Sequence, residues 1–279
     1  MRAIWAALGL VAAGCASVEQ AEPMRTYAVA DHVVRMAGDL PEVTGIRVSM
    51  AETFNPLFAE PFPPSIRAMA HHHTVTGLDA LPVDVAFNQV PQQVRGFTRD
   101  SEGLTHVASG LRCPDRWSFN IEGLNLSDLV LTDVRSYEEE DGDVECEYRA
   151  EQGLISFSLR ATKWPEMTAA LHVRGSVLLL QERLPSAVPT EIAVAQVQGD
   201  PSTRTLVKGT SGAGLEFTEE GLSGVVAVYI TKVGDWHIKG QVIMVPRDDR
   251  VLAVATLIQQ FSAVRVDRIQ LELLQNESV

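Results

Sequence analysis

The chain has 279 residues, of which 46% are hydrophobic and 21% charged, and it carries a formal net charge of −13. This composition is typical of a folded globular protein. The acidic excess speaks against nucleic acid as a partner, because nucleic-acid binders need a basic stripe, and against electrostatic docking on anionic lipid headgroups. A self-repelling surface is the simplest interpretation of the charge.

The first segment of the chain has the form of a secretory signal. Arg2 precedes an apolar run over residues 3–13, and Gly14-Cys15 follows where a cleavage site belongs. The run is too short to cross hydrocarbon as a helix, which takes about 20 residues. A membrane anchor or a plain N-terminal helix is the alternative interpretation.

These residues resemble the signal of bacterial lipoproteins, in which a cysteine is lipidated and becomes the first residue of the mature chain. The resemblance implies a signal peptide over residues 1–14, a lipid on Cys15 and a tether over residues 15–26. Ala12 stands where that family usually has Leu, so the lipobox departs from the pattern at one position. Ala16 in place of Asp after the cysteine implies sorting to the outer membrane. We therefore expect a protein of the cell envelope, anchored by lipid and facing the periplasm.

Residues 27–95 have a mixed pattern that predicts an irregular N-terminal region. Alternation over residues 44–50 predicts one strand, and several prolines follow it. His71, His72 and His73 stand together, but adjacent residues of a helix or strand do not all point one way. An exposed loop is therefore favoured over a metal site.

From residue 96 onward, strand-like and helix-like patterns follow one another closely. Short connections between the first strands predict an antiparallel meander, since parallel strands need long crossovers. The alternation and the prolines predict, in chain order, strands at 117–121, 129–134 and 155–159, a helix from Pro165 to Pro185, a strand at 191–197, a hairpin over 225–245 that turns at Gly234-Asp235, a helix from Pro246, and either a strand or a helix end at 265–274.

These elements predict the α+β class, with antiparallel sheet and two main helices packed on one face. Each helix follows a set of strands and begins at a proline, so residues 96–187 and 188–279 look like two similar halves. A duplicated β-β-α unit and a chance similarity explain this equally well. The core over residues 96–279 is accordingly one domain or two similar halves.

Two cysteines remain besides Cys15. Cys113 and Cys146 form an even number in a compartment that is expected to be oxidising, which predicts a disulfide. The bridge would close a loop of about 34 residues, worth about 3–4 kcal/mol. Two buried thiols or a metal pair are the alternatives, and no C-x-x-C spacing supports the metal pair.

A few polar residues suggest a catalytic site without forming a motif. His106 and Ser109 are close in sequence, but the G-x-S-x-G pattern of a nucleophile elbow is absent. A Ser/His/Asp site would need distant residues such as Asp235 and His237. Asp235, His237 and Lys239 share one face of a strand, and an outward-facing polar arm is the favoured interpretation.

Other motifs do not indicate a cofactor. The acidic run over residues 138–143 lacks the spacing of an EF-hand and is interpreted as a solvated hairpin tip. Phosphate-loop, dinucleotide, zinc-protease and C-x-x-C motifs are absent from the sequence. We therefore predict no metal and no cofactor.

Three segments, over residues 109–114, 144–148 and 228–236, are similar to exported bacterial proteins of unassigned function. The resemblance implies a disulfide with flanking strands and no particular activity. We expect a lipid-anchored binding or accessory protein without catalysis, whose partners are the membrane and an envelope protein. The alternatives are an envelope hydrolase assembled from distant Ser, His and Asp residues, and a structural subunit of an outer-membrane assembly.

Overall fold

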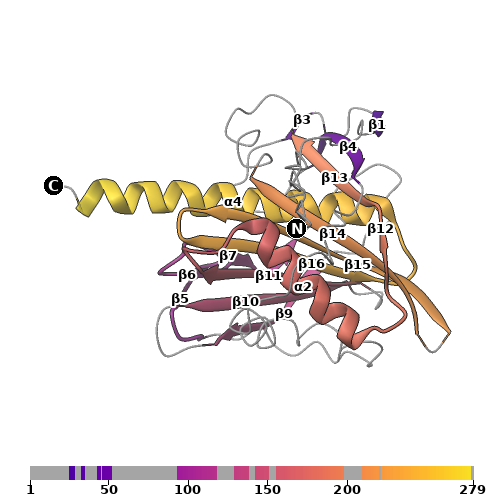
Figure 1. Cartoon of the computed structure of the whole chain (residues 1–279). Helices are drawn as coiled ribbons and strands as arrows, with labels where there is room; N and C mark the ends of the chain where they lie inside the picture. The colour runs from indigo at the N-terminus through magenta and orange to yellow at the C-terminus, as the bar shows by residue number, and fades with distance from the viewer. Residues whose placement is uncertain are drawn as a thin grey trace, which may run out of the picture.

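A computed structural model describes residues 93–117, 129–137, 142–150, 155–197, 209–219 and 221–277, together with four short strands between residues 25 and 51. Its centre is an eight-stranded antiparallel sheet in the order β12-β14-β15-β16-β11-β10-β9-β8 (Figure 1). The strands are β8 (Arg116–Trp117), β9 (Leu129–Ser136), β10 (Asp143–Ala150), β11 (Ile155–Lys163), β12 (Val188–Thr190), β14 (Thr210–Glu219), β15 (Leu222–Val233) and β16 (Trp236–Met244).

Smaller sheets and two helices surround this sheet. The remaining elements are the sheet of β1 (Arg25–Ala28), β4 (Ile46–Ala51) and β13 (Ile192–Val197), the sheet of β5 (Phe97–Arg99), β6 (Gly103–His106) and β7 (Arg112–Pro114), the pair β2 (Val33–Val34) and β3 (Val43–Thr44), and the helices α2 (Ala169–Arg183) and α4 (Asp249–Glu277).

The central pair of the large sheet is β11 with β16. The two strands pair along their whole length, from Ile155 opposite Met244 to Lys163 opposite Trp236. Alternate residues of a strand point to opposite faces. One face of this pair is therefore apolar, with Phe157 and Leu159 in the main hydrophobic core, while the other face carries polar side chains.

Helix α4 lies between the large sheet and the sheet of β1, β4 and β13. Every described side chain from Val251 to Ala263 is buried, as expected of a helix that is covered on all sides. Gln259 donates hydrogen bonds from Nε2 to the Thr231 hydroxyl at 2.9 Å and the Ile238 carbonyl at 2.7 Å. Gly240 allows this close approach, since a Cβ there would lie 2.8 Å from that of Gln259.

Helix α2 packs on the opposite face of the large sheet, over β14 and β15. Thr168 caps its start, where the hydroxyl accepts a hydrogen bond from Leu171 N–H at 3.2 Å. Its apolar side chains form a second core that is separate from the α4 core. Its members include Ala169, Val173, Val177 and Leu180 of the helix, with Leu215, Phe217, Val226, Val228 and Ile230 of the sheet.

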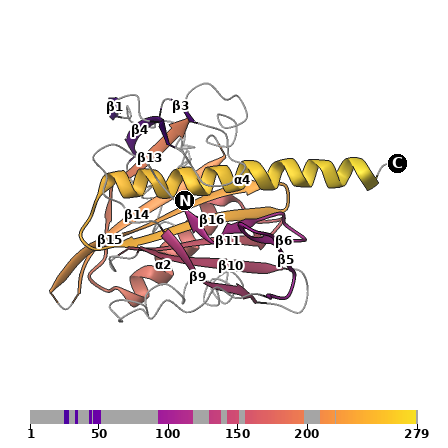
Figure 2. The same cartoon turned by 180° about the vertical axis from the view of Figure 1, so that it is seen from behind.

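The structure confirms the α+β class and the antiparallel sheet, but the expected placement of both helices on one face is wrong. Figure 1 shows α2 in front of the sheet, and Figure 2, from behind, shows α4 in front. The reason is that β15 is apolar on both faces, so each face needs a cover. The predicted turn at Gly234-Asp235 is confirmed, and residues 265–274 are helical.

The opposite placement also bears on the duplicated unit. Counted outward from the central pair of β11 and β16, the strands are β11, β10 and β9 on one side and β16, β15 and β14 on the other, so the two halves have the same order. A two-fold axis perpendicular to the sheet exchanges two neighbouring antiparallel strands and leaves each element on the same face of the sheet. A duplicated unit related by this axis would therefore place both helices on one face. The helices do not follow such an axis, and α2 packs on strands of the other half.

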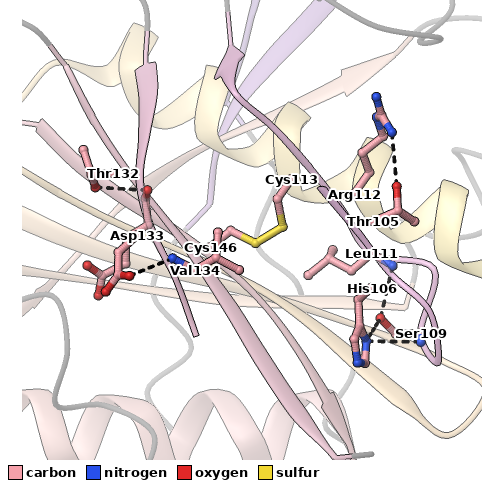
Figure 3. The surroundings of a disulfide bond; sticks show 11 residues. Thr105, His106, Ser109, Leu111, Arg112, Cys113, Thr132, Asp133, Val134 and Cys146 are labelled. Carbon is pink, nitrogen blue, oxygen red and sulfur yellow. Dashed lines mark hydrogen bonds between the residues drawn. A yellow bond between two sulfur atoms is a disulfide. The ribbon is translucent and has the colours of Figure 1, made fainter. Parts of the chain in front are cut away.

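The two cysteines join the sheet of β5–β7 to the large sheet. Cys113 on β7 and Cys146 on β10 form a disulfide with their Cα atoms 6.1 Å apart, and both are fully buried (Figure 3). This Cα separation lies in the usual range for a bridge. The sequence-based pairing thus agrees with the geometry of the fold.

We expect the double substitution Cys113→Ala, Cys146→Ala to lower the free energy of unfolding by about 3–4 kcal/mol, because the bridge links residues 33 apart. Chemical denaturation measures the loss, and peptide mass spectrometry without reductant checks the pairing. The Cys15→Ser variant is the control and should unfold like the wild type. Free thiols at both positions would contradict the pairing.

Candidate functional site

His106 and Ser109 do lie together, in the turn between β6 and β7. The His106 Nδ1 and Ser109 Oγ atoms are 2.8 Å apart, and the hydroxyl accepts a hydrogen bond from Leu111 N–H at 3.1 Å (Figure 3). The Ser109 backbone N–H donates to His106 Nδ1 at 3.3 Å, so Nδ1 is an acceptor and the imidazole is the neutral Nε2–H tautomer. Ser109 is fully buried, so this pair closes the turn and presents no nucleophile to a substrate.

The other two predicted site residues lie elsewhere. Asp235 is exposed in the hairpin turn, where its carbonyl accepts a hydrogen bond from Trp164 N–H at 2.7 Å. His106 lies against the ring of Trp236, on the α4 face of the sheet, while His237 points to the α2 face. The structure therefore does not bring the four residues into one Ser/His/Asp site.

His237 forms a buried pair with His172 of α2. Its Nε2 lies 3.0 Å from the Met167 carbonyl, which only accepts, so Nε2 carries the hydrogen. The Nδ1 atoms of the two rings are 3.0 Å apart, so His172 donates to neutral His237. Burial, together with the charge of Lys232, lowers the pKa of His237 to about 4.

This pair predicts a loss of stability in acid. The pKa of His237 is about 4 in the fold against 6.5 for an ordinary histidine, so its contribution is complete above pH 6.5 and is lost as the pH falls toward 4. The difference corresponds to about 3 kcal/mol.

Denaturant unfolding of the wild type between pH 7 and 4 measures this loss. The His237→Gln variant should show a flatter dependence on pH, and the matched His106→Gln variant should keep the wild-type slope because His237 stays in place. Equal slopes in the wild type and His237→Gln would contradict the assignment.

The most unusual polar group is a line of charged side chains across β9, β10, β11 and β16. The strand registers place Arg135 opposite Glu145, Glu145 opposite Arg160, and Arg160 opposite Lys239. We call these four residues the charged row. Glu145, Arg160 and Lys239 are only 3%, 1% and 2% exposed, although charged side chains are rarely buried without partners.

Most of the charged row has partners. Arg135 Nε lies 2.7 Å from Asp133 Oδ2, and Arg160 Nη2 lies 3.0 Å from Asp143 Oδ2. The Tyr137 hydroxyl donates to Glu145 Oε2 at 2.5 Å, and the Arg160 guanidinium lies 4.6 Å from the centre of the Tyr137 ring. These contacts satisfy the part of the row that β9, β10 and β11 carry.

Lys239 differs from the other three residues. Its ammonium makes no hydrogen bond or ion pair with any residue that the structure describes, and the buried Thr162 hydroxyl on β11 likewise has no partner. Burial and the neighbouring charge of Arg160 lower the pKa of Lys239 to about 8, partly opposed by Glu145 and Asp143. A perturbed, unsatisfied lysine of this kind is a candidate for a functional group.

One carboxyl group beside the row is also perturbed. Burial raises the pKa of Glu147 to about 7, although the charge of Arg135 opposes the shift. Glu147 lies opposite Asp133 on β9, and its carboxyl is 3.4 Å from Arg135 Nη1. Arg135 thus has two carboxyl groups beside it, Asp133 and Glu147.

The sequence did not single out the charged row. Alternation of charged and apolar residues over 143–148 is the same for a solvated face and for a buried polar face. Lys239 was placed on the same face as His237, which is correct, but this face is buried and the expected outward-facing arm is wrong. Arg160 and Lys239 become neighbours only through the β11–β16 pairing.

Several predictions lie outside the described residues. These are Cys15, the triple histidine His71–His73, and residues 138–141 of the acidic run. Among the side chains that are described, no three His, Cys, Asp or Glu residues are arranged to hold a metal ion. Within the same residues, neither α2 nor α4 combines the length and the apolar character of a membrane-spanning helix.

No protein-family model and no curated protein sequence matches the chain. The class of protein is thus defined by its own features: an α+β protein whose large sheet carries one apolar face and one face with a buried charged row.

Proposed function

We propose that the protein is a lipid-anchored binding protein of the cell envelope that takes its ligand at the charged row, without catalysis. The observation that carries the proposal is the buried ammonium of Lys239, which faces Arg160 and makes no ion pair with a described residue. The signal-like residues up to Cys15 support the location and the anchor.

The energetics explain why an unsatisfied lysine points to a ligand. A charge removed from water without a partner destabilises a fold by several kcal/mol, and an apolar side chain of similar size would avoid this. Folds keep such destabilising groups mainly where function requires them. A ligand that bonds to Lys239 would offset the desolvation of the ammonium.

The features of the two histidine sites favour binding over hydrolysis. The Ser109 hydroxyl is already bonded to His106 and Leu111 and is buried beneath the turn. His237 bonds to His172 and Met167 on the other face of the sheet. Acyl transfer needs a nucleophile that the substrate can reach, and these residues do not form one.

We expect the Cys15→Ser variant to lose palmitate labelling and to move from the membrane fraction to the periplasmic extract. The thioether-linked diacylglycerol and the amide-linked acyl chain of a lipoprotein are both attached to the cysteine, and one or no acyl chain anchors poorly. Metabolic labelling with cell fractionation measures both effects. The Cys113→Ala, Cys146→Ala variant keeps Cys15 and is the control. Undiminished labelling of Cys15→Ser would end the lipoprotein proposal.

A second candidate function is a structural subunit of an outer-membrane assembly. The observation that favours it is the last part of α4, which projects beyond the sheets and exposes Leu271, Leu273 and Leu274 by 52%, 44% and 64% (Figure 2). Grouped exposed apolar side chains are common at contacts between proteins.

Native mass spectrometry of the lipidated protein, taken from the envelope in mild detergent, separates the two functions. We expect a bound small molecule on the wild type and on Lys163→Met, an exposed lysine on β11, and its loss from Lys239→Met. A small molecule retained by Lys239→Met would refute the site. A bound protein that is lost on changing Leu271 and Leu274 to Ser would favour the assembly subunit.

A further inference from the structure

Arg160 and Lys239 form a like-charge pair across the β11–β16 seam. They are directly opposite in the register, and both point away from the α4 core. Side chains in such positions start about 5 Å apart, and like charges there repel each other. Neither side chain is more than 2% exposed, so water screens the repulsion less than it would at the surface.

Among the described residues, the carboxylates near this pair lie on one side of it. Asp143 and Glu145 lie on β10, beyond Arg160, and Asp143 bonds to the guanidinium. On the other side of Lys239 the row continues to Ile230 of β15, which is apolar. His237 and Lys232 also lie on that side, and neither adds negative charge.

The positions diagonal to the pair carry neutral groups that can donate hydrogen bonds. Thr162 and Ser158 flank Arg160 on β11, and Gln241 flanks Lys239 on β16. All three are buried, and the Thr162 hydroxyl makes no hydrogen bond with the described residues. Around Lys239, this face of the sheet thus presents two cations and several neutral hydrogen-bond donors. In the described part of the chain, the carboxylates near them lie on β10.

From this arrangement, and resting on the proposed binding function, we infer that the ligand binds through an oxyanion, a carboxylate or phosphate group, held between Lys239 and Arg160 with the Thr162 hydroxyl as a further donor. An oxyanion removes the repulsion within the like-charge pair. It also supplies the missing acceptor for the ammonium in a charge-assisted hydrogen bond. A cationic or neutral ligand would do neither.

The experiment measures thermal unfolding of the full lipidated protein in uncharged detergent at pH 7. Chloride is replaced at constant ionic strength by inorganic phosphate in one arm and by acetate in another. A third arm adds phosphatidylglycerol to the micelles, which separates a lipid phosphate from a free one. A wild type whose site binds the anion should gain roughly 5–10 °C in Tm at 100 times the dissociation constant.

Three variants test whether the shift comes from the pair. Lys239→Met should abolish the anion-dependent shift while its Tm in chloride equals or exceeds that of the wild type, because a buried charge without a partner is removed. Lys239→Gln makes the same test with a neutral polar side chain should the Met variant fold poorly. Lys163→Met is the matched control and should keep the wild-type shift.

The outcomes separate this inference from the function on which it rests. A shift in one arm alone identifies the phosphate, carboxylate or lipid source. No shift in any arm, or an equal shift in Lys239→Met, overturns the inference. A neutral or cationic ligand that native mass spectrometry finds on the wild type and not on Lys239→Met also overturns it, while the binding function stands. An anion-dependent shift with no envelope ligand at Lys239 overturns the function instead.

Discussion

The pairing of β11 with β16 is the contact on which the other features of the fold depend. It joins two sets of antiparallel strands into one sheet of eight. Because side chains alternate between faces, the register that puts Phe157 and Ile238 against α4 also puts Arg160 beside Lys239 on the other face. A shift of one residue would bring these charges into the main core. The apolar core therefore fixes the position of the charged row.

The two faces of the sheet differ in how many polar groups they carry. The α4 face is almost wholly apolar, and the Gln259 amide N–H groups on it bond to Thr231 and Ile238. The α2 face holds a network that is well paired at Arg135 and less so at Lys239. A buried polar network stabilises a fold only when all its members are satisfied. The Lys239 end is thus where a ligand can contribute most binding energy.

Local patterns predicted the local elements well. The turn at Gly234 follows from a glycine that adopts φ +54° between two alternating strands, and the helix before Pro185 follows from its apolar spacing. The position of α2 was harder to predict, because its buried side includes His172, Gly175 and Ser176, which hydropathy does not select. The strand at 191–197 was predicted, but it pairs with β4 across 140 residues of chain rather than with the large sheet. No pattern in a single sequence carries such long-range pairing.

The sequence by itself determined several of the strands, the two helices, the α+β class and the pairing of Cys113 with Cys146, since these depend on periodicity, turn residues and the count of cysteines. It did not predict β14, the ten-residue strand that lies under α2. Export and lipidation at Cys15 stay a prediction from the sequence. The tertiary structure decided that the helices cover opposite faces, that His106 and His237 lie on different sides of the sheet, and that Lys239 is buried opposite Arg160. The reason is that alternation in a strand says which residues share a face, whereas only packing decides what covers that face.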